Sequence, residues 1–113
     1  MRPEDDLSSF RIMWVLVFFD LPVGTKKERK QASGFRKDLL KDGFGMMQFS
    51  VYIRHCPSQE SANAHIGRVR KCLPPKGQVS ILQITDRQYA NIINYWETGT
   101  KPLPEGPRQL EMF

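Results

Sequence analysis

The chain has 113 residues, which fits one domain that can bury a core without disulfides or metal ions. Its formal net charge of +5 favours a polyanionic partner, nucleic acid first, over the plain alternative of a merely basic soluble protein. Cys56 and Cys72 form no CxxC pair, and His55-Cys56 has no second ligand cluster. We therefore expect reduced thiols and no zinc site.

Residues 1–11 are acidic and polar, and we expect them to form a loose N-terminal lead-in. They lack the basic start and the cleavage signal of a secretory peptide. The eight apolar residues that follow, Ile12 to Phe19, are too few for a membrane span, which needs roughly 20. The cytoplasm is therefore the expected location.

The apolar run predicts a strand of about 26 Å, at roughly 3.3 Å per residue. Both sets of alternating side chains are apolar, so we expect an interior strand that is covered on both faces. Asp20 ends the run and Leu21-Pro22 follows it. The carboxylate should therefore lie where the chain leaves the core for solvent.

A helix is predicted to begin after Thr25, because Thr25 and Glu28 have the capping-box spacing. It should end near Asp42-Gly43, where glycine tolerates the left-handed cap. Its apolar residues repeat at intervals of three and four, as one buried face requires: Ala32, Phe35 and Leu39.

The opposite face of this predicted helix is basic. At about 100° per residue, four lysines fall within roughly 60° of arc, and they are Lys26, Lys30, Lys37 and Lys41. Two arginines, Arg29 and Arg36, lie to one side of them. Such a stripe is most often a solvated face, and the functional interpretation is contact with nucleic-acid phosphates.

The segment 45–54 is rich in strand-forming residues and predicts two short strands, with a tight turn or bulge near Gln48 to Ser50. Ser58 is a plausible N-cap for a second helix that runs to about Leu73. The expected inner face of that helix consists of Ala62, Ile66, Val69 and Leu73.

Residues 74–77 predict a turn, and the alternating segment 78–85 predicts another strand. Residues 86–90 are expected to form one helical turn, and Ile92 to Trp96 is a candidate fifth strand. Residues 97–113 contain three prolines and two glycines and should form an extended C-terminal tail.

The predicted order, βαββαβ with an extra C-terminal strand, indicates an α+β, ferredoxin-like domain over residues 12–96. Both helices would cover one face of an antiparallel sheet. The other face then needs a cover, because an apolar patch of that size rarely stays exposed on a monomer. A homodimer through the open face is the simplest solution, and the segment Ile92 to Trp96 could extend the partner's sheet.

The chain resembles a known family, the small CRISPR-associated adaptation protein, which is also called the CRISPR-associated endoribonuclease of family two. The resemblance covers about residues 12–96 and depends on five pieces in order: FFDLP with Asp20, FRKDLLKDGF, QFSVYIR, LPPKGQV and ITDRQY. The FFDLP form and the long second segment look most like the variety found with type II systems. Many relatives have tyrosine where this chain has Phe19, which removes one hydroxyl.

The resemblance implies a ferredoxin-like homodimer at the centre of the complex that inserts spacers into a CRISPR array. The dimer would bridge two dimers of the adaptation integrase, and duplex DNA would lie across the basic surface. The resemblance also implies metal-dependent cleavage of RNA or DNA, with Asp20 as catalytic metal ligand. The main role would nevertheless be non-catalytic.

A lone carboxylate is a poor magnesium site, since Mg²⁺ usually takes one or two carboxylates together with waters and phosphate oxygens. A two-fold dimer could supply one Asp20 from each subunit. From the residues alone, Asp20 is an ordinary turn-capping aspartate. Ser50 matches the family's SV(F/Y) step and would support the site by hydrogen bonding, although the same hydroxyl suits any strand or turn. His55 and His65 have no support as general bases.

Two further interpretations stay open. The first is a ferredoxin-like RNA-binding or toxin-like RNase module unrelated to CRISPR, although no aromatic stacking platform is evident for it. The second concerns the tail, where the apolar side chains of Leu110, Met112 and Phe113 follow a proline-rich spacer and could bind a partner chain. A frayed end is the plain alternative.

Overall fold

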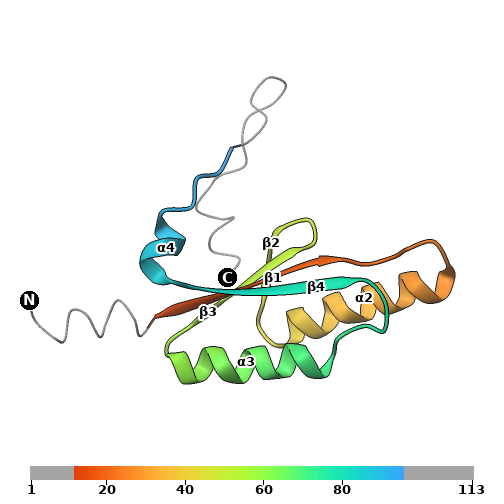
Figure 1. Ribbon diagram of the computed structural model, residues 1–113, viewed down its shortest axis with the longest axis horizontal. Coiled ribbons are helices and arrows are strands. Elements are labelled where there is room, and N and C mark those ends of the chain that lie inside the picture. Colours follow the sequence, from red (N-terminus) through yellow and green to blue (C-terminus); the bar gives the residue numbers. More distant parts are fainter. Residues whose placement is uncertain (1–11, 96–113) are drawn as a thin grey trace, which may run out of the picture.

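The computed structural model describes residues 12–95, and residues 1–11 and 96–113 lie outside the description. Four strands form one sheet in the order β2-β3-β1-β4, with every neighbouring pair antiparallel. Figure 1 labels the elements, which are β1 (Met13–Asp20), α2 (Lys26–Lys41), β2 (Gly45–Gln48), β3 (Val51–Cys56), α3 (Gln59–Lys71), β4 (Gln78–Thr85) and α4 (Asp86–Ala90). This βαββαβ order confirms the ferredoxin-like arrangement.

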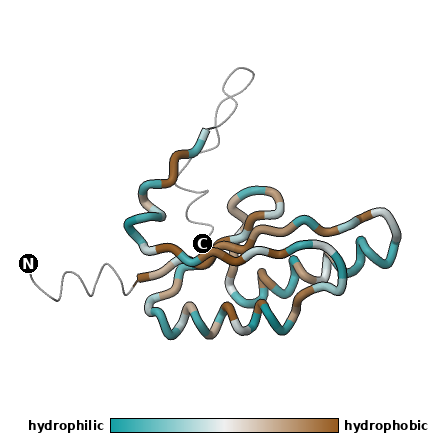
Figure 2. The backbone as a smooth tube through the Cα atoms, viewed as in Figure 1, coloured by the Kyte–Doolittle hydropathy of each residue, from teal (hydrophilic) through white to brown (hydrophobic). Residues whose placement is uncertain are grey.

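The strand β1 lies inside the sheet, between β3 and β4, as its two apolar faces predicted. One face carries Val15 and Val17, which are fully buried in the main core against α2 and α3. The other face carries Trp14 and Leu16, which pack with Ile53 of β3 in a second, smaller cluster. Figure 2 shows the most apolar part of the chain along these central strands.

Helix α2 begins as the capping box predicted. The Thr25 side chain accepts a hydrogen bond from the Glu28 amide, and the Glu28 carboxylate accepts one from the Thr25 amide, both at 3.0 Å. The Thr25 amide lowers the pKa of Glu28, since it stabilises the charged form. The buried residues of α2 are those expected: Ala32, Phe35 and Leu39.

Helix α3 begins at the expected N-cap, because the Ser58 hydroxyl accepts from the Ser61 amide at 3.0 Å. Its inner face differs in part from the prediction. Leu73 is 46% exposed, because the helix ends at Lys71 and the helical periodicity does not continue to Leu73. His65 is buried instead, between the predicted core positions Ala62 and Val69.

Helices α2 and α3 cover one face of the sheet, and α4 lies on the other (Figure 1). The helical turn predicted at residues 86–90 is therefore confirmed as α4. Its Tyr89 ring stacks on Trp14 at 3.8 Å between ring centres, and Trp14 Nε1 donates to the Asp86 carboxylate at 2.7 Å. Two further side chains of this face, among the residues that the structure describes, are partly open to solvent: Phe18 is 36% and Leu82 47% exposed.

The expected fifth strand is not formed within the described part of the chain. Residues 92–95 have no regular secondary structure, and Trp96 lies outside the described residues. A strand needs a backbone partner, and the segment after α4 leads away from the sheet (Figure 1). Pairing of this segment with the sheet of a second subunit, like the homodimer itself, stays a prediction. None of the helices described between residues 12 and 95 is long and apolar enough to cross a membrane.

Candidate functional site

Asp20 is the last residue of β1 and is exposed, as its place after the apolar run predicted. It lies opposite Gln78 in β4. A shallow hollow of about 310 Å³ opens beside it, and Ser50 and Ser80 also line the hollow. The end of the central strand therefore presents a carboxylate and two hydroxyls to solvent at one place.

Ser50 reaches this hollow because of an irregular turn between β2 and β3. Its φ is +66°, a left-handed conformation that is uncommon outside glycine. The pairing of β2 with β3 shifts register between Met46 and Gln48, so the bulge or turn predicted near Gln48 to Ser50 is confirmed. The Ser50 carbonyl accepts a hydrogen bond from the Phe19 amide at 3.0 Å, which holds the turn beside the residue that precedes Asp20.

These oxygens suit a hard cation such as Mg²⁺, which binds carboxylate, hydroxyl and water oxygens. Asp20 is the one carboxylate among the residues that line the hollow. Over residues 12–95, no group of three or more histidine, cysteine, aspartate or glutamate side chains is placed to hold a metal. The donor set of one chain thus fits a metal ion in part, since Mg²⁺ usually takes one or two carboxylates with waters and phosphate oxygens.

The basic face of α2 is arranged as predicted. Its four lysines are exposed, opposite the buried face of the helix: Lys26, Lys30, Lys37 and Lys41. Arg29 donates to the Val23 carbonyl at 3.0 Å. The Arg36 guanidinium lies over the Phe49 ring, 5.5 Å from its centre. The helix can thus offer several cations to a polyanion at once.

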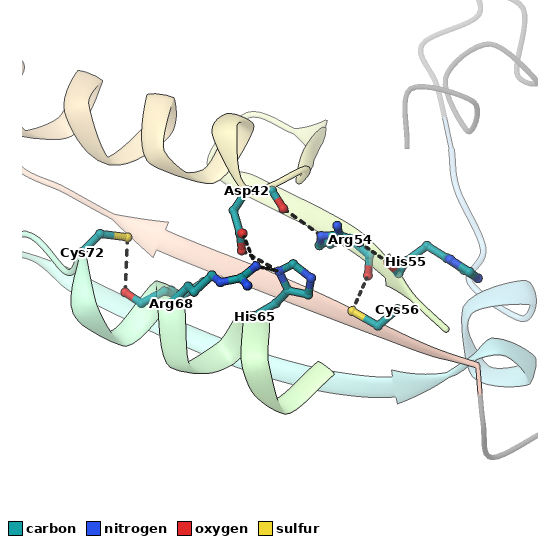
Figure 3. Close-up of polar contacts among 8 residues, drawn as sticks. Asp42, Arg54, His55, Cys56, His65, Arg68 and Cys72 are labelled. Carbon is teal, nitrogen blue, oxygen red and sulfur yellow. Dashed lines mark hydrogen bonds and ion pairs between the residues drawn. The ribbon is translucent and has the colours of Figure 1, made fainter. Parts of the chain in front are cut away.

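Sequence reasoning missed a polar cluster at the end of α2, which we call the Asp42 cluster: Asp42, His65 and Arg68. The Asp42 carboxylate contacts His65 Nδ1 at 2.7 Å and accepts from Arg68 at 2.9 Å (Figure 3). Its backbone carbonyl accepts from Arg54 Nε at 2.8 Å. Asp42 and His65 are 23 positions apart, so no short motif links them in the sequence. The only local signal for the cluster was the helical spacing that puts His65 on the inner face of α3.

The Asp42 cluster ties the end of α2 to α3. The side chains of His65 and Asp42 are only 9% and 17% exposed, whereas that of Arg68 is 60% exposed. Since an ionised carboxylate only accepts hydrogen bonds, His65 Nδ1 carries the proton that it shares with Asp42. His65 does not line the hollow at Asp20, and its role is in packing.

Both described thiols are free. Cys56 is fully buried and Cys72 is half-buried, and burial raises the pKa of both thiols, because it disfavours the thiolate. His55 is exposed, while Cys56 is in the core. The predicted partner-binding residues of the tail lie outside the described part of the chain, and they are Leu110, Met112 and Phe113.

Comparison with known proteins agrees with this fold. The model of the family described as CRISPR associated protein Cas2 matches residues 13–92. The chain is 50% identical over 109 residues to the CRISPR-associated endoribonuclease Cas2 of Flavobacterium psychrophilum, covering 95% of this chain and 93% of the relative. It is 48% identical to the protein of that name from Parvibaculum lavamentivorans, over 89% of this chain and 100% of the relative.

A solved structure titled "Crystal structure of cas2" superposes with a TM-score of 0.55 and 19% sequence identity. The match covers 82% of this chain and 95% of that one. Because the two sequences are only 19% identical, the structural similarity is evidence about the fold alone, and it supports the ferredoxin-like arrangement.

Proposed function

This chain belongs to the CRISPR associated protein Cas2 family, and we propose on that basis that it is a CRISPR adaptation protein. In this proposal a homodimer binds duplex DNA and bridges two dimers of the adaptation integrase while new spacers are inserted. Family membership favours this function over an RNA-binding or toxin-like module unrelated to CRISPR. The assignment to type II systems stays a prediction from the FFDLP form.

The observation that carries DNA binding is the exposed lysine stripe of α2. Lysines that neutralise phosphates release counterions, so binding weakens as salt rises, with a logarithmic slope of about −0.9 per neutralised phosphate. If each of the four lysines neutralises one phosphate, they contribute about 3.6 to that slope. Between about 50 and 200 mM salt, this contribution corresponds to roughly 150-fold in affinity.

The test compares two variants of equal charge. The first replaces the four stripe lysines by glutamate, namely Lys26, Lys30, Lys37 and Lys41. The second replaces four exposed cations elsewhere by glutamate, namely Arg70, Lys71, Lys76 and Arg87. Each replacement changes the charge by two, so both variants have a formal net charge of −3 in place of +5.

Affinity for a blunt duplex is measured across salt concentrations. We expect the stripe variant to lose most of the binding and most of the salt dependence, while the second variant loses much less. Equal losses in the two variants would show that only the net charge matters, and the stripe would then not be the binding face. Intact binding by the stripe variant would overturn the assignment altogether.

We propose metal-dependent cleavage of RNA or DNA at Asp20 as a second activity. It is supported by the hollow that Asp20 shares with Ser50, and by the relatives, which carry the name CRISPR-associated endoribonuclease Cas2. One Asp20 from each subunit of a homodimer would hold Mg²⁺, and Ser50 would support the carboxylate by hydrogen bonding. Bound Mg²⁺ supplies an activated water and neutralises phosphate charge.

Cleavage is measured with and without EDTA for the wild type, for Asp20→Ala and for Asp38→Ala, which removes an exposed carboxylate from α2. We expect Asp20→Ala and EDTA to abolish cleavage and Asp38→Ala to leave it intact. Cleavage that survives in Asp20→Ala would come from a contaminant or from another site.

Spacer acquisition in cells then separates the two activities. The same Asp20→Ala variant is compared with the wild type, with the oligomeric state of the purified variant checked in parallel. Continued acquisition would assign the biological role to scaffolding, and its loss in an intact dimer would assign it to metal chemistry.

The tail is proposed to bind the integrase through its apolar end, namely Leu110, Met112 and Phe113. A chain that ends at Thr98 should then capture less integrase than the full chain in a pull-down. Undiminished capture would exclude the tail as the binding segment.

A further inference from the structure

Phe49 is unusually exposed for a large aromatic residue. It lies in the turn between β2 and β3, and 78% of it is open to solvent. The Arg36 guanidinium lies 5.5 Å from the ring centre, within the distance of a cation–π contact. Arg36 therefore holds the ring from the side of α2, while most of the ring surface remains free.

The position of Phe49 connects two surfaces that are already described. Arg36 belongs to α2, which also displays the four exposed lysines. The next residue after Phe49, Ser50, lines the hollow beside Asp20, and its carbonyl is bonded to the Phe19 amide. The ring thus lies between the basic helix and the hollow, on a turn that is fixed to the central strand.

An aromatic ring with a free face can stack on a nucleic-acid base, but only on a base that is not already stacked between neighbours in a duplex. Arg36 adds a cation beside the ring, which complements a phosphate next to that base. We propose that Phe49 and Arg36 bind an unpaired nucleotide in a single-stranded extension of the duplex that α2 holds. This inference rests on the proposed DNA binding and adds to it a preference for extended ends.

The experiment uses the full chain and two labelled DNA probes: a blunt duplex, and the same duplex with a short single-stranded extension. Binding is measured for the wild type and for Phe49→Ala, Phe49→Trp and Met46→Ala. Met46 is the matched control, because it is an apolar side chain of β2 that is 45% exposed. Tryptophan keeps a stacking surface at position 49.

We expect the wild type to prefer the extended probe, and Phe49→Ala to lose about 5- to 150-fold in affinity for it, the range of one base–aromatic stack. Affinity for the blunt duplex should stay unchanged. Phe49→Trp should retain the preference, and Met46→Ala should behave as the wild type. Arg36→Lys keeps the charge but loses the planar guanidinium, so it should reduce the preference in part.

Three results would overturn the inference. The first is a wild type that binds both probes equally. The second is a Phe49→Ala variant that keeps the wild-type preference. The third is a Phe49→Ala variant that loses both probes together with its oligomeric state, because the ring would then cover a second copy of the chain. In the first two cases duplex binding itself would stand, whereas a wild type that fails on the blunt duplex would instead refute the proposed DNA binding.

Discussion

Replacing Asp42 with alanine tests whether the Asp42 cluster stabilises the fold. The change removes the carboxylate that contacts His65 at 2.7 Å and Arg68 at 2.9 Å. The backbone at position 42 has φ −85° and ψ 9°, which alanine adopts without strain. The carbonyl that accepts from Arg54 stays in place. The variant therefore removes side-chain contacts and little else.

The expected magnitude follows from the burial of the two partners. His65 is 9% exposed in its side chain, so its N–H would be left without its acceptor, at a cost of about 1–3 kcal/mol. Arg68 is 60% exposed, and its pair with Asp42 contributes at most about 1 kcal/mol. We therefore expect Asp42→Ala to lower the free energy of unfolding by about 2 kcal/mol, and Arg68→Ala by less than about 1 kcal/mol.

The measurement is urea unfolding, followed by far-ultraviolet circular dichroism at pH 7. All variants are compared at one protein concentration, because any association of subunits would make stability depend on concentration. Asp38→Ala is the control, since it removes an exposed carboxylate from the last turn of α2, next to the C-cap Asp42. An Asp42→Ala variant within about 0.5 kcal/mol of the wild type would refute the reasoning, as would an Arg68→Ala variant that costs as much as Asp42→Ala.

Three further predictions concern the core, a helix cap and the thiols. Leu39→Ala should lower the free energy of unfolding by about 2–5 kcal/mol, because Leu39 is 1% exposed. Leu40 is 53% exposed, so Leu40→Ala should change that free energy by no more than about 0.5 kcal/mol in the same urea experiment. Thr25→Ala should lower the free energy of unfolding by about 1 kcal/mol, because the α2 cap is lost. Thr25→Ser keeps the hydroxyl, so it should retain most of that stability. Since burial raises the pKa of the Cys72 thiol, this thiol should react with a thiol reagent more slowly than free cysteine at pH 8, and faster as pH rises. Mass spectrometry should find Cys56 labelled only after unfolding, and its rapid labelling in the native protein would contradict its burial.

Much of the fold is predictable from the sequence, because local patterns determine where elements begin and end. The unbroken run of eight apolar residues identified the central strand, and the spacing of Thr25 and Glu28 located the start of α2. Prediction was wrong where the local pattern continued past a real end. Leu73 fits the helical repeat but follows the helix. Residues 92–95 are apolar enough for a strand, but they pair with no strand within the described residues 12–95.

The candidate site, like the fold, could be predicted from the sequence only in part. The exposed position of Asp20 at the end of β1, and the outward direction of the α2 lysines, follow from the sequence, because each depends only on the periodicity of one element. The contact of Asp42 with His65 and the placement of Arg36 over Phe49 join separate elements, and so only the tertiary structure decided them. Periodicity states which face of an element is buried, but not which element packs against it or where along its length.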